Sequence, residues 1–249
     1  MDTYVCILST DNYLEGVLVL NYNLQQLHST HDLLCLITDN ISDKTKDILN
    51  FFNIKYKIVN NLKYDSDQSY TRWNPTFSKF YVFSLTEYNK VVYLDSDFLI
   101  LENIDHLFNL DSFTMNSDMP YHQDKYNSSI MIIKPDLNDF NKLVAGMNSY
   151  SEKNITNIGD QNIINDFLSN ISSLDSSYNV MRYLFKDEEK DYYRTQVVTT
   201  NVTNPKVIHY IGSIKPFMVN SFTDEYSYIY EDYLNKVRTK IKEFEKDKI

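Results

Sequence analysis

The chain has 249 residues, a formal net charge of −10 and a pI of about 4.9. This acidic balance argues against a general nucleic-acid-binding protein. The N-terminus lacks the pattern of a signal peptide, and no apolar stretch approaches the roughly 18 residues of a transmembrane helix. Two cysteines, Cys6 and Cys35, lie in apolar runs and fit a reducing compartment. We therefore expect a cytoplasmic protein without a membrane span.

The first 60 residues alternate between apolar runs and helical periodicity. We expect strands at 3–8, 33–38 and 55–59, with helices at 16–26 and 42–52 between them. This order predicts a parallel sheet with right-handed crossovers, flanked by helices. Later expected elements are helices at 76–85, 105–110, 137–149, 162–168 and 224–246 and strands at 91–94, 114–119, 126–133 and 207–210. Because no linker or repeat divides the chain, we expect one α/β domain over residues 1–249.

Two aspartates follow the apolar strand at 91–94. Asp95 and Asp97 flank Ser96, and a second apolar run follows at 98–101. Ligands of open α/β sheets bind beyond the carboxyl ends of strands, where these carboxylates would lie. Carboxylates suit Mg²⁺ or Mn²⁺, with substrate phosphates completing the coordination. The alternative is an ordinary loop or helix cap, for which Asp-x-Asp is common.

Other polar residues have structural explanations that compete with a functional one. Lys79 could be a surface lysine whose stem covers apolar neighbours. Asp118 could be a turn residue, and Asp160 with Gln161 could be first-turn helix chemistry. His209 follows a strand and precedes Gly-x-x-Lys-Pro, which places a cation and an unhindered backbone beside it. No Gly-rich phosphate loop is present, so bound phosphates would need metal and side chains.

Four motifs follow one another along the chain: the segment YLDSDFLILENID at 93–105, Tyr126-Asn127-Ser128, Gly159-Asp160-Gln161, and His209-x-x-Gly212 with Lys215-Pro216. They resemble those of glycogenin-like family 8 glycosyltransferases, and the match runs from about residue 4 to 216. Ser129 stands where that family usually has glycine. The resemblance implies a GT-A, Rossmann-like fold with a mostly parallel central sheet. It also implies retaining transfer of a sugar from a UDP-sugar donor.

The resemblance also assigns roles to residues of this chain. Asp95, Asp97 and His209 would ligate Mn²⁺, with Mg²⁺ as an alternative, while Lys215 and the Gly212 backbone would hold the pyrophosphate. Asp160 and Gln161 would act at the reacting sugar. The residues that it places in the nucleotide-sugar site are Leu8, Thr10, Asp11, Tyr13, Arg72, Lys79, Asp95, Ser96, Asp97, Asp118, Asn127, Ser128, Asp160, Gln161, His209, Gly212 and Lys215.

We therefore expect Mn²⁺-dependent transfer of a hexose, with glucose favoured, to a protein tyrosine or a glycan hydroxyl. Self-glucosylation is left open, because Tyr183, Tyr192 and Tyr193 lie in the corresponding region but not at the family's offset. A homodimer is expected from the resemblance. The alternatives are a UDP-galactose or UDP-xylose transferase, a phosphatase-like hydrolase, and a non-catalytic nucleotide-sugar-binding protein.

Overall fold

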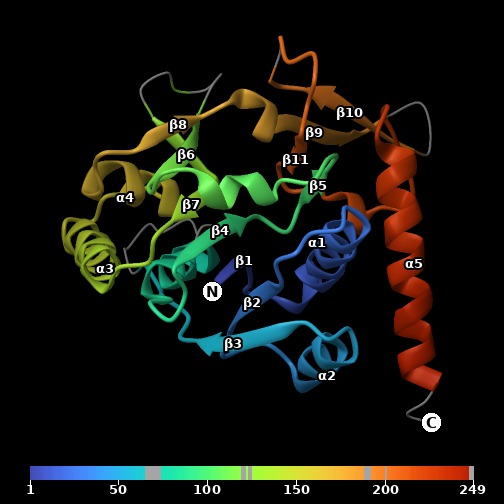
Figure 1. Ribbon diagram of the computed structural model, residues 1–249, viewed down its shortest axis with the longest axis horizontal. Helices are drawn as coiled ribbons and strands as arrows, with labels where there is room; N and C mark the ends of the chain where they lie inside the picture. Colours follow the sequence, from blue (N-terminus) through green and yellow to red (C-terminus); the bar gives the residue numbers. More distant parts are fainter. Residues whose placement is uncertain (65–73, 119–121, 123–124, 188–191, 200, 247–249) are drawn as a thin grey trace.

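The computed structural model describes residues 1–64, 74–118, 122, 125–187, 192–199 and 201–246. A seven-stranded sheet forms its centre, in the order β3-β2-β1-β4-β7-β6-β8 (Figure 1). The bounds of its strands are β1 Asp2–Leu8, β2 Leu33–Thr38, β3 Lys55–Val59, β4 Lys90–Leu94, β6 Thr114–Ser117, β7 Tyr126–Ile133 and β8 Ser172–Leu174. Strands β3, β2, β1 and β4 run parallel, as predicted, whereas β7 is antiparallel to β4 and to β6.

Helices cover both faces of this sheet. Their bounds are α1 Leu14–Gln26, α2 Asp43–Phe51, α3 Leu137–Glu152, α4 Asp160–Phe167 and α5 Ser227–Lys246. Short 3-10 helices are η1 Asp11–Tyr13, η2 Asn74–Ser84, η3 Asp105–Asn109, η4 Ser176–Tyr178 and η5 Pro216–Met218. Figure 1 shows α5 alongside α1 and α2 at one side of the molecule, while α3 and α4 lie together at the other.

Strand alternation explains the two hydrophobic cores. Successive side chains of a strand point to opposite faces, so Tyr4 and Cys6 join one core while Val5 joins the other. Both faces are buried, and β1 therefore reads as a continuous apolar run rather than an alternating one. Cys6 and Cys35 are paired in register on neighbouring strands and are both buried, free thiols.

A second, five-stranded sheet has the order β12-β10-β9-β11-β5. Its strands are β5 Phe98–Ile100, β9 Val180–Lys186, β10 Tyr193–Val197, β11 Val207–Ile211 and β12 Phe222–Thr223. The antiparallel pairing of β5 with β11 sets Phe98 opposite His209. The turn between β4 and β5 therefore connects the two sheets and carries Asp95 and Asp97.

Some elements differ from the sequence-based expectation. The apolar run after Asp97 forms β5 of the second sheet, and the region 174–193, read as mixed, holds β9 and the start of β10. The expected helix at 76–85 is the 3-10 helix η2, and α5 begins at Ser227 rather than 224. The expected loop at 60–71 lies outside the described residues beyond position 64.

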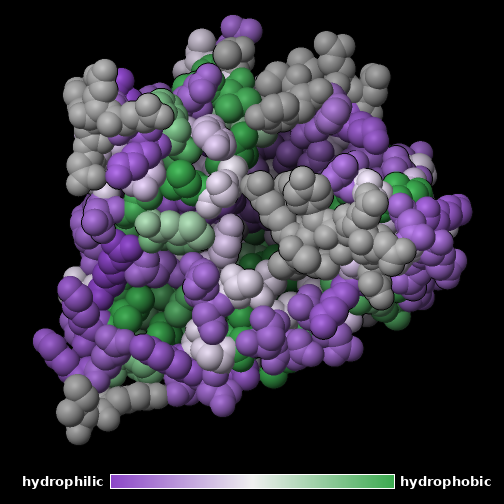
Figure 2. Space-filling model, turned by 180° about the vertical axis from the view of Figure 1, so that it is seen from behind, coloured by the Kyte–Doolittle hydropathy of each residue, from purple (hydrophilic) through white to green (hydrophobic). Residues whose placement is uncertain are grey.

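Polar residues dominate the described part of the molecular face that Figure 1 hides. Seen from the side opposite to Figure 1, hydrophilic residues predominate and hydrophobic ones form separate patches between them (Figure 2). Within the ranges that the structure describes, none of the helices has the length and apolar character needed to cross a membrane.

Asp105, at the start of η3, forms hydrogen bonds with both β1 and the segment before β2. Its carboxylate accepts hydrogen bonds from the Tyr4 hydroxyl at 2.9 Å, the Ser29 hydroxyl at 2.8 Å and the Thr30 backbone N–H at 2.8 Å. Against the opposing effect of burial, these donors lower the pKa of Asp105 to about 2.

We expect Asp105→Asn to lower the free energy of unfolding by about 1–3 kcal/mol at pH 7, because the donors lose a charged acceptor. Because the pKa of Asp105 is lower in the folded than in the unfolded protein, its ionised carboxylate stabilises the fold. This contribution to the free energy of unfolding is fully present above the unfolded-state pKa near 4, and it is lost as the pH falls toward 2. Urea denaturation of both proteins should therefore show their difference shrinking below pH 4. Asp43→Asn, at an exposed pair with Lys46, is the control and should change little. A pH-independent difference would contradict this role.

Candidate active site

A cavity of about 570 Å³ opens where β1 and β4 end and β11 passes beside them. Ser9 and Thr10 follow β1, and Asp95 follows β4, so polar groups line the carboxyl edge of the parallel strands. Helix α1 approaches this turn closely. A Cβ added at Gly16 would lie 2.7 Å from the Ser96 carbonyl oxygen, so glycine there permits the contact.

Asp95, Asp97 and His209 bring one ligand atom each to within 4.8 Å of one another. One buried carboxylate oxygen, Asp97 Oδ1, has no hydrogen-bond partner among the residues that the structure describes. A buried unpaired carboxylate oxygen is costly unless a cation or donor satisfies it. Two carboxylates and an imidazole are a donor set compatible with Mn²⁺, so these residues fit a divalent cation.

The His209 imidazole is oriented by Asn179. His209 Nδ1 lies 2.8 Å from Asn179 Oδ1, and this carbonyl oxygen can only accept, which places the ring proton on Nδ1. His209 Nε2, which lies 3.5 Å from Asp97 Oδ1, is then left with its lone pair facing the carboxylates. Burial, opposed by Asp97, lowers the pKa of His209 to about 4. The ring is therefore neutral at pH 7, as a metal ligand must be.

Lys215 lies at the opposite side of the Asp97 carboxylate. Its ammonium group forms an ion pair with Asp97 Oδ2 and donates to the Tyr210 carbonyl at 2.9 Å. Burial opposes ionisation of both groups, but their mutual attraction outweighs it. The pKa of Lys215 is raised by Asp97, and the pKa of Asp97 is lowered by Lys215 and His209. The pair is therefore charged and buried at the cavity wall.

Lys79 forms a second buried cluster across the cavity. Its Nζ lies 3.2 Å from Asp95 Oδ1 and 3.0 Å from Asp160 Oδ2, and it donates to the Ser128 carbonyl at 3.2 Å. The Ser128 hydroxyl donates to Asp160 Oδ2 at 2.7 Å. Lys79 is thus a buried, paired cation rather than a surface lysine. Burial and the neighbouring Asp97 raise the pKa of Asp95 to about 6, although Lys79 opposes this shift.

Hydrogen bonds connect the polar groups at the start of β7 to Asp118 and to helix α4. Asn127 donates to Asp118 Oδ1 at 3.0 Å and accepts from the Ser129 N–H at 3.0 Å. The Gln161 side-chain oxygen accepts from the Ser128 N–H at 3.4 Å. Helix α4 therefore presents Asp160 and Gln161 from its first turn, against the start of β7.

The structure brings most of the predicted site residues to one cavity. The residues predicted for the nucleotide-sugar site that line it are Thr10, Tyr13, Lys79, Asp95, Ser96, Asp97, Asn127, Ser128, Asp160, Gln161, His209, Gly212 and Lys215. Leu8 and Asp11 do not: Leu8 is fully buried in the core, and exposed Asp11 accepts from the Ser42 N–H. Asp118 reaches the cavity only through Asn127, and Arg72 lies outside the described residues.

Sequence reasoning missed two residues that hold the acidic cluster in place. The Tyr93 hydroxyl donates to Asp95 Oδ1 at 2.6 Å, and Asn179 orients His209. Tyr93 was expected as a buried strand residue, and its position two residues before Asp95, on the same side of the strand, is a usable signal. Asn179 lies far along the chain and carries no comparable signal.

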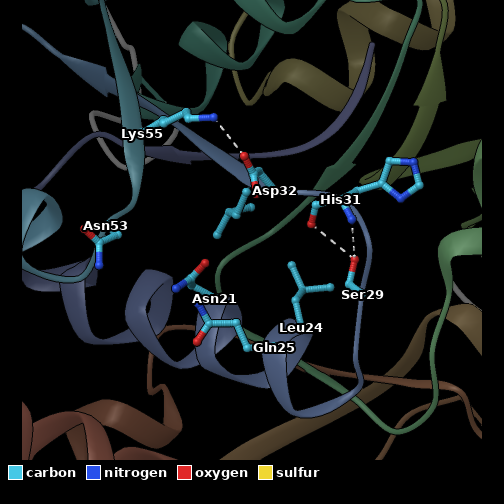
Figure 3. A pocket seen from close by; sticks show the side chains of 9 residues that line it. Asn21, Leu24, Gln25, Ser29, His31, Asp32, Asn53 and Lys55 are labelled. Atoms are coloured by element: carbon cyan, nitrogen blue, oxygen red, sulfur yellow. Dashed lines mark hydrogen bonds and ion pairs between the residues drawn. The ribbon is translucent and has the colours of Figure 1, made fainter.

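A second, smaller cavity of about 110 Å³ lies between α1, Ser29–Leu33 and the start of β3. Figure 3 shows the amide side chains of Asn21, Gln25 and Asn53 around it and the ion pair of Lys55 with Asp32 at its rim. The acidic cluster is not among its lining residues. We therefore place the candidate active site at the larger cavity.

Solved structures show which class of fold this is. The galactosyltransferase LgtC superposes with a TM-score of 0.67 at 18% identity, covering 95% of this chain and 96% of its own. GlyE of Streptococcus pneumoniae superposes with a TM-score of 0.64 at 17% identity, covering 99% of this chain and 65% of its own. The predicted fold is confirmed as a GT-A glycosyltransferase fold, with a mostly parallel sheet and flanking helices.

Sequence comparison then gives the family. The model described as Glycosyl transferase family 8 matches residues 4–134 and 113–219, and the chain belongs to this family. Glycogenin-1 of Caenorhabditis elegans is 30% identical over 223 residues, and human glycogenin-1 is 28% identical over 219. Inositol phosphorylceramide glucuronosyltransferase 1 of Arabidopsis thaliana is 32% identical over 167 residues. These matches cover 87%, 86% and 66% of this chain but 51%, 61% and 29% of the relatives.

Proposed function

We propose that this protein transfers a hexose from a UDP-sugar to an acceptor hydroxyl, with retention at the anomeric carbon. The observation that carries the proposal is the cluster of half-buried Asp95 with buried Asp97 and His209 beside buried Lys215. Among the described residues, Asp97 Oδ1 in this cluster has no hydrogen-bond partner. Membership of glycosyl transferase family 8 supports the same reaction. A phosphatase-like use of Asp-x-Asp is disfavoured, because that arrangement normally follows the first strand, whereas here it follows β4.

In this proposal, the UDP part of the donor is held by the proposed metal ligands and by Lys215 with Gly212. Asp95, Asp97 and His209 would hold Mn²⁺ or Mg²⁺, which supplies positive charge to the diphosphate oxygens. Lys215 and the backbone at Gly212 would neutralise the charge that develops on departing UDP. Gly212 has a φ of +88°, which a residue with a side chain adopts only under strain.

Lys79, Asp160 and Gln161 would position the sugar. Asp160 already accepts from Ser128 and pairs with Lys79, so its carboxylate is held in place. This arrangement suits orientation of sugar hydroxyls, or stabilisation of positive charge near the anomeric carbon, better than nucleophilic attack. We therefore favour departure of UDP and attack by the acceptor on the same face of the sugar. A glycosyl adduct trapped on Asp160 in mass spectrometry would contradict this path.

Glucose is the donor sugar that we propose, on the likeness to the two glycogenins. Glucuronic acid and galactose are competing sugars, because the similar proteins also include a glucuronosyltransferase and a galactosyltransferase. Xylose is the further alternative expected from the sequence. The acceptor is a glycan or a protein tyrosine, and self-glucosylation is part of this alternative. A homodimer, a cytoplasmic location and one domain over residues 1–249 stay predictions.

A panel of UDP-glucose, UDP-galactose, UDP-xylose and UDP-glucuronic acid tests the proposal. We expect UDP release from one donor with Mn²⁺ and at least a 100-fold slower release with EDTA, because the leaving group then lacks its cation. Intact mass measured on the same samples would report self-glycosylation. UDP binding without release from any donor would instead favour a nucleotide-sugar-binding protein.

A further inference from the structure

An exposed aromatic pair lies beside the candidate active site on β9. Tyr183 and Phe185 are 40% and 37% exposed, which is unusual for large rings in the interior of a five-stranded sheet. They are two residues apart in one strand, so they share a face and stand about 7 Å apart along it. From the sequence alone, Tyr183 stands out only as a tyrosine in the region of the family's self-glycosylation site.

The register of β9 against β11 places this pair on the cavity side of the sheet. Tyr183 is paired with Ile211 and Met181 with His209 in parallel strands. Paired residues of neighbouring strands point to the same face, and both Ile211 and His209 line the cavity. Tyr183 and Phe185 therefore continue the face that carries the proposed metal ligand His209.

Contact with Gly212 fixes the position of the Tyr183 ring. A Cβ built on Gly212 would overlap Cε2 of Tyr183, so the ring rests directly on this glycine. Gly212 also lines the cavity in which the donor diphosphate is proposed to bind. The ring thus occupies the border between the donor cavity and the exposed face of β9.

Polar groups flank the two rings. Gln196 is paired with Tyr183 and Arg194 with Phe185 across the antiparallel β9–β10 ladder, and both are exposed on the same face. Arg194 is held by Asp187 at 2.6 Å. Flat apolar rings bordered by amide and charged groups match the chemistry of a sugar, which has an apolar C–H face and a rim of hydroxyls.

We propose that Tyr183 and Phe185 form a platform that binds a pyranose ring of a glycan acceptor. This inference rests on the proposed transferase function and selects its acceptor class, a glycan rather than a protein tyrosine. The acceptor hydroxyl would then approach the donor sugar across Gly212. The aromatic faces supply packing, and the hydroxyl of Tyr183 is not required.

Acceptor kinetics with matched variants test the platform. Maltotriose, cellotriose, lactose and xylotriose serve as acceptors, with the active UDP-sugar and Mn²⁺. For the acceptor that is used, we expect Tyr183→Ala and Phe185→Ala each to raise its KM about ten-fold, while Tyr183→Phe stays within two-fold. Val197→Ala removes an exposed apolar side chain from the other face of β10 and should also stay within two-fold.

Several results would overturn the platform without touching the transferase proposal. They are donor turnover with no transfer to any of the four oligosaccharides, an unchanged KM in both alanine variants, and equal losses in Tyr183→Ala and Tyr183→Phe. A hexose added to wild type but not to Tyr183→Phe would make Tyr183 the acceptor rather than a platform. A wild-type protein that releases no UDP from any donor would instead remove the function on which the platform rests.

Discussion

Asp97→Asn is expected to lower the rate of UDP release from the active donor at least 10³-fold. Asparagine keeps the size of the side chain but removes the charge that two neighbours depend on. The proposed cation loses a carboxylate ligand, and buried Lys215 loses its ion-pair partner. A loss of about 4 kcal/mol in transition-state stabilisation corresponds to this factor.

The control for Asp97→Asn must separate catalysis from folding. Circular dichroism and thermal unfolding should show a folded variant, because Asn can still accept from the Lys215 ammonium group. Asp139→Asn, at an exposed ion pair with Lys142 on α3, should leave the release rate unchanged. A folded Asp97→Asn variant that retains a tenth or more of wild-type activity would exclude Asp97 as a ligand of an essential cation.

Arg182→Met is expected to be the most destabilising of the proposed substitutions. Arg182 is buried, at 4% exposed, and its guanidinium pairs with buried Asp224 at 3.7 Å. It also donates to the exposed Glu225 carboxylate, at 3.0 Å for one nitrogen. These contacts join β9 to the segment that precedes α5. Removal of Arg182 leaves the buried Asp224 carboxylate without its cation, at a cost of about 3–5 kcal/mol, whereas exposed Glu225 is solvated.

Thermal and urea unfolding measure this effect. We expect the Tm of Arg182→Met to fall on the order of 10 °C. Adding Asp224→Leu to Arg182→Met should restore part of the loss, because no buried carboxylate is then left unpaired. Lys44→Ala, at the exposed pair with Glu245, is the control and should change the Tm little. A change of less than 2 °C in Arg182→Met would show that the pair contributes no net stability.

Most of the parallel strands could be predicted because β1, β2 and β4 are buried on both faces and form continuous apolar runs. Strands β2 and β3 have the predicted bounds, β1 and β4 each begin one residue earlier, and the antiparallel β7 also has its predicted bounds. In the second sheet only β11 was expected as a strand, and the other strands were missed for a physical reason. Strand β5 has three residues and β12 has two, too few for a period to be recognised, and β9 and β10 flank the charged run 186–191.

The site was only partly predictable. Asp95 and Asp97 follow a recognisable buried strand, so their chemistry could be read locally. His209 and Lys215 come from a distant part of the chain, and only the family resemblance placed them with the aspartates. The resemblance also misplaced Leu8, which was expected in the nucleotide-sugar site. Leu8 is the last residue of β1, but its side chain is fully buried in the core and does not line the cavity. The hydrogen bond from His209 Nδ1–H to the Asn179 side-chain oxygen depends on tertiary packing that no local pattern reports.

The most direct test of the account is the affinity for UDP with and without Mn²⁺, measured by calorimetry. If Asp95, Asp97 and His209 hold a cation that binds the diphosphate, wild-type protein should bind UDP at least 100-fold more tightly with Mn²⁺ than with EDTA. Asp97→Asn should lose most of this difference. Equal UDP affinity in the two conditions would contradict a metal-dependent nucleotide site at this cavity.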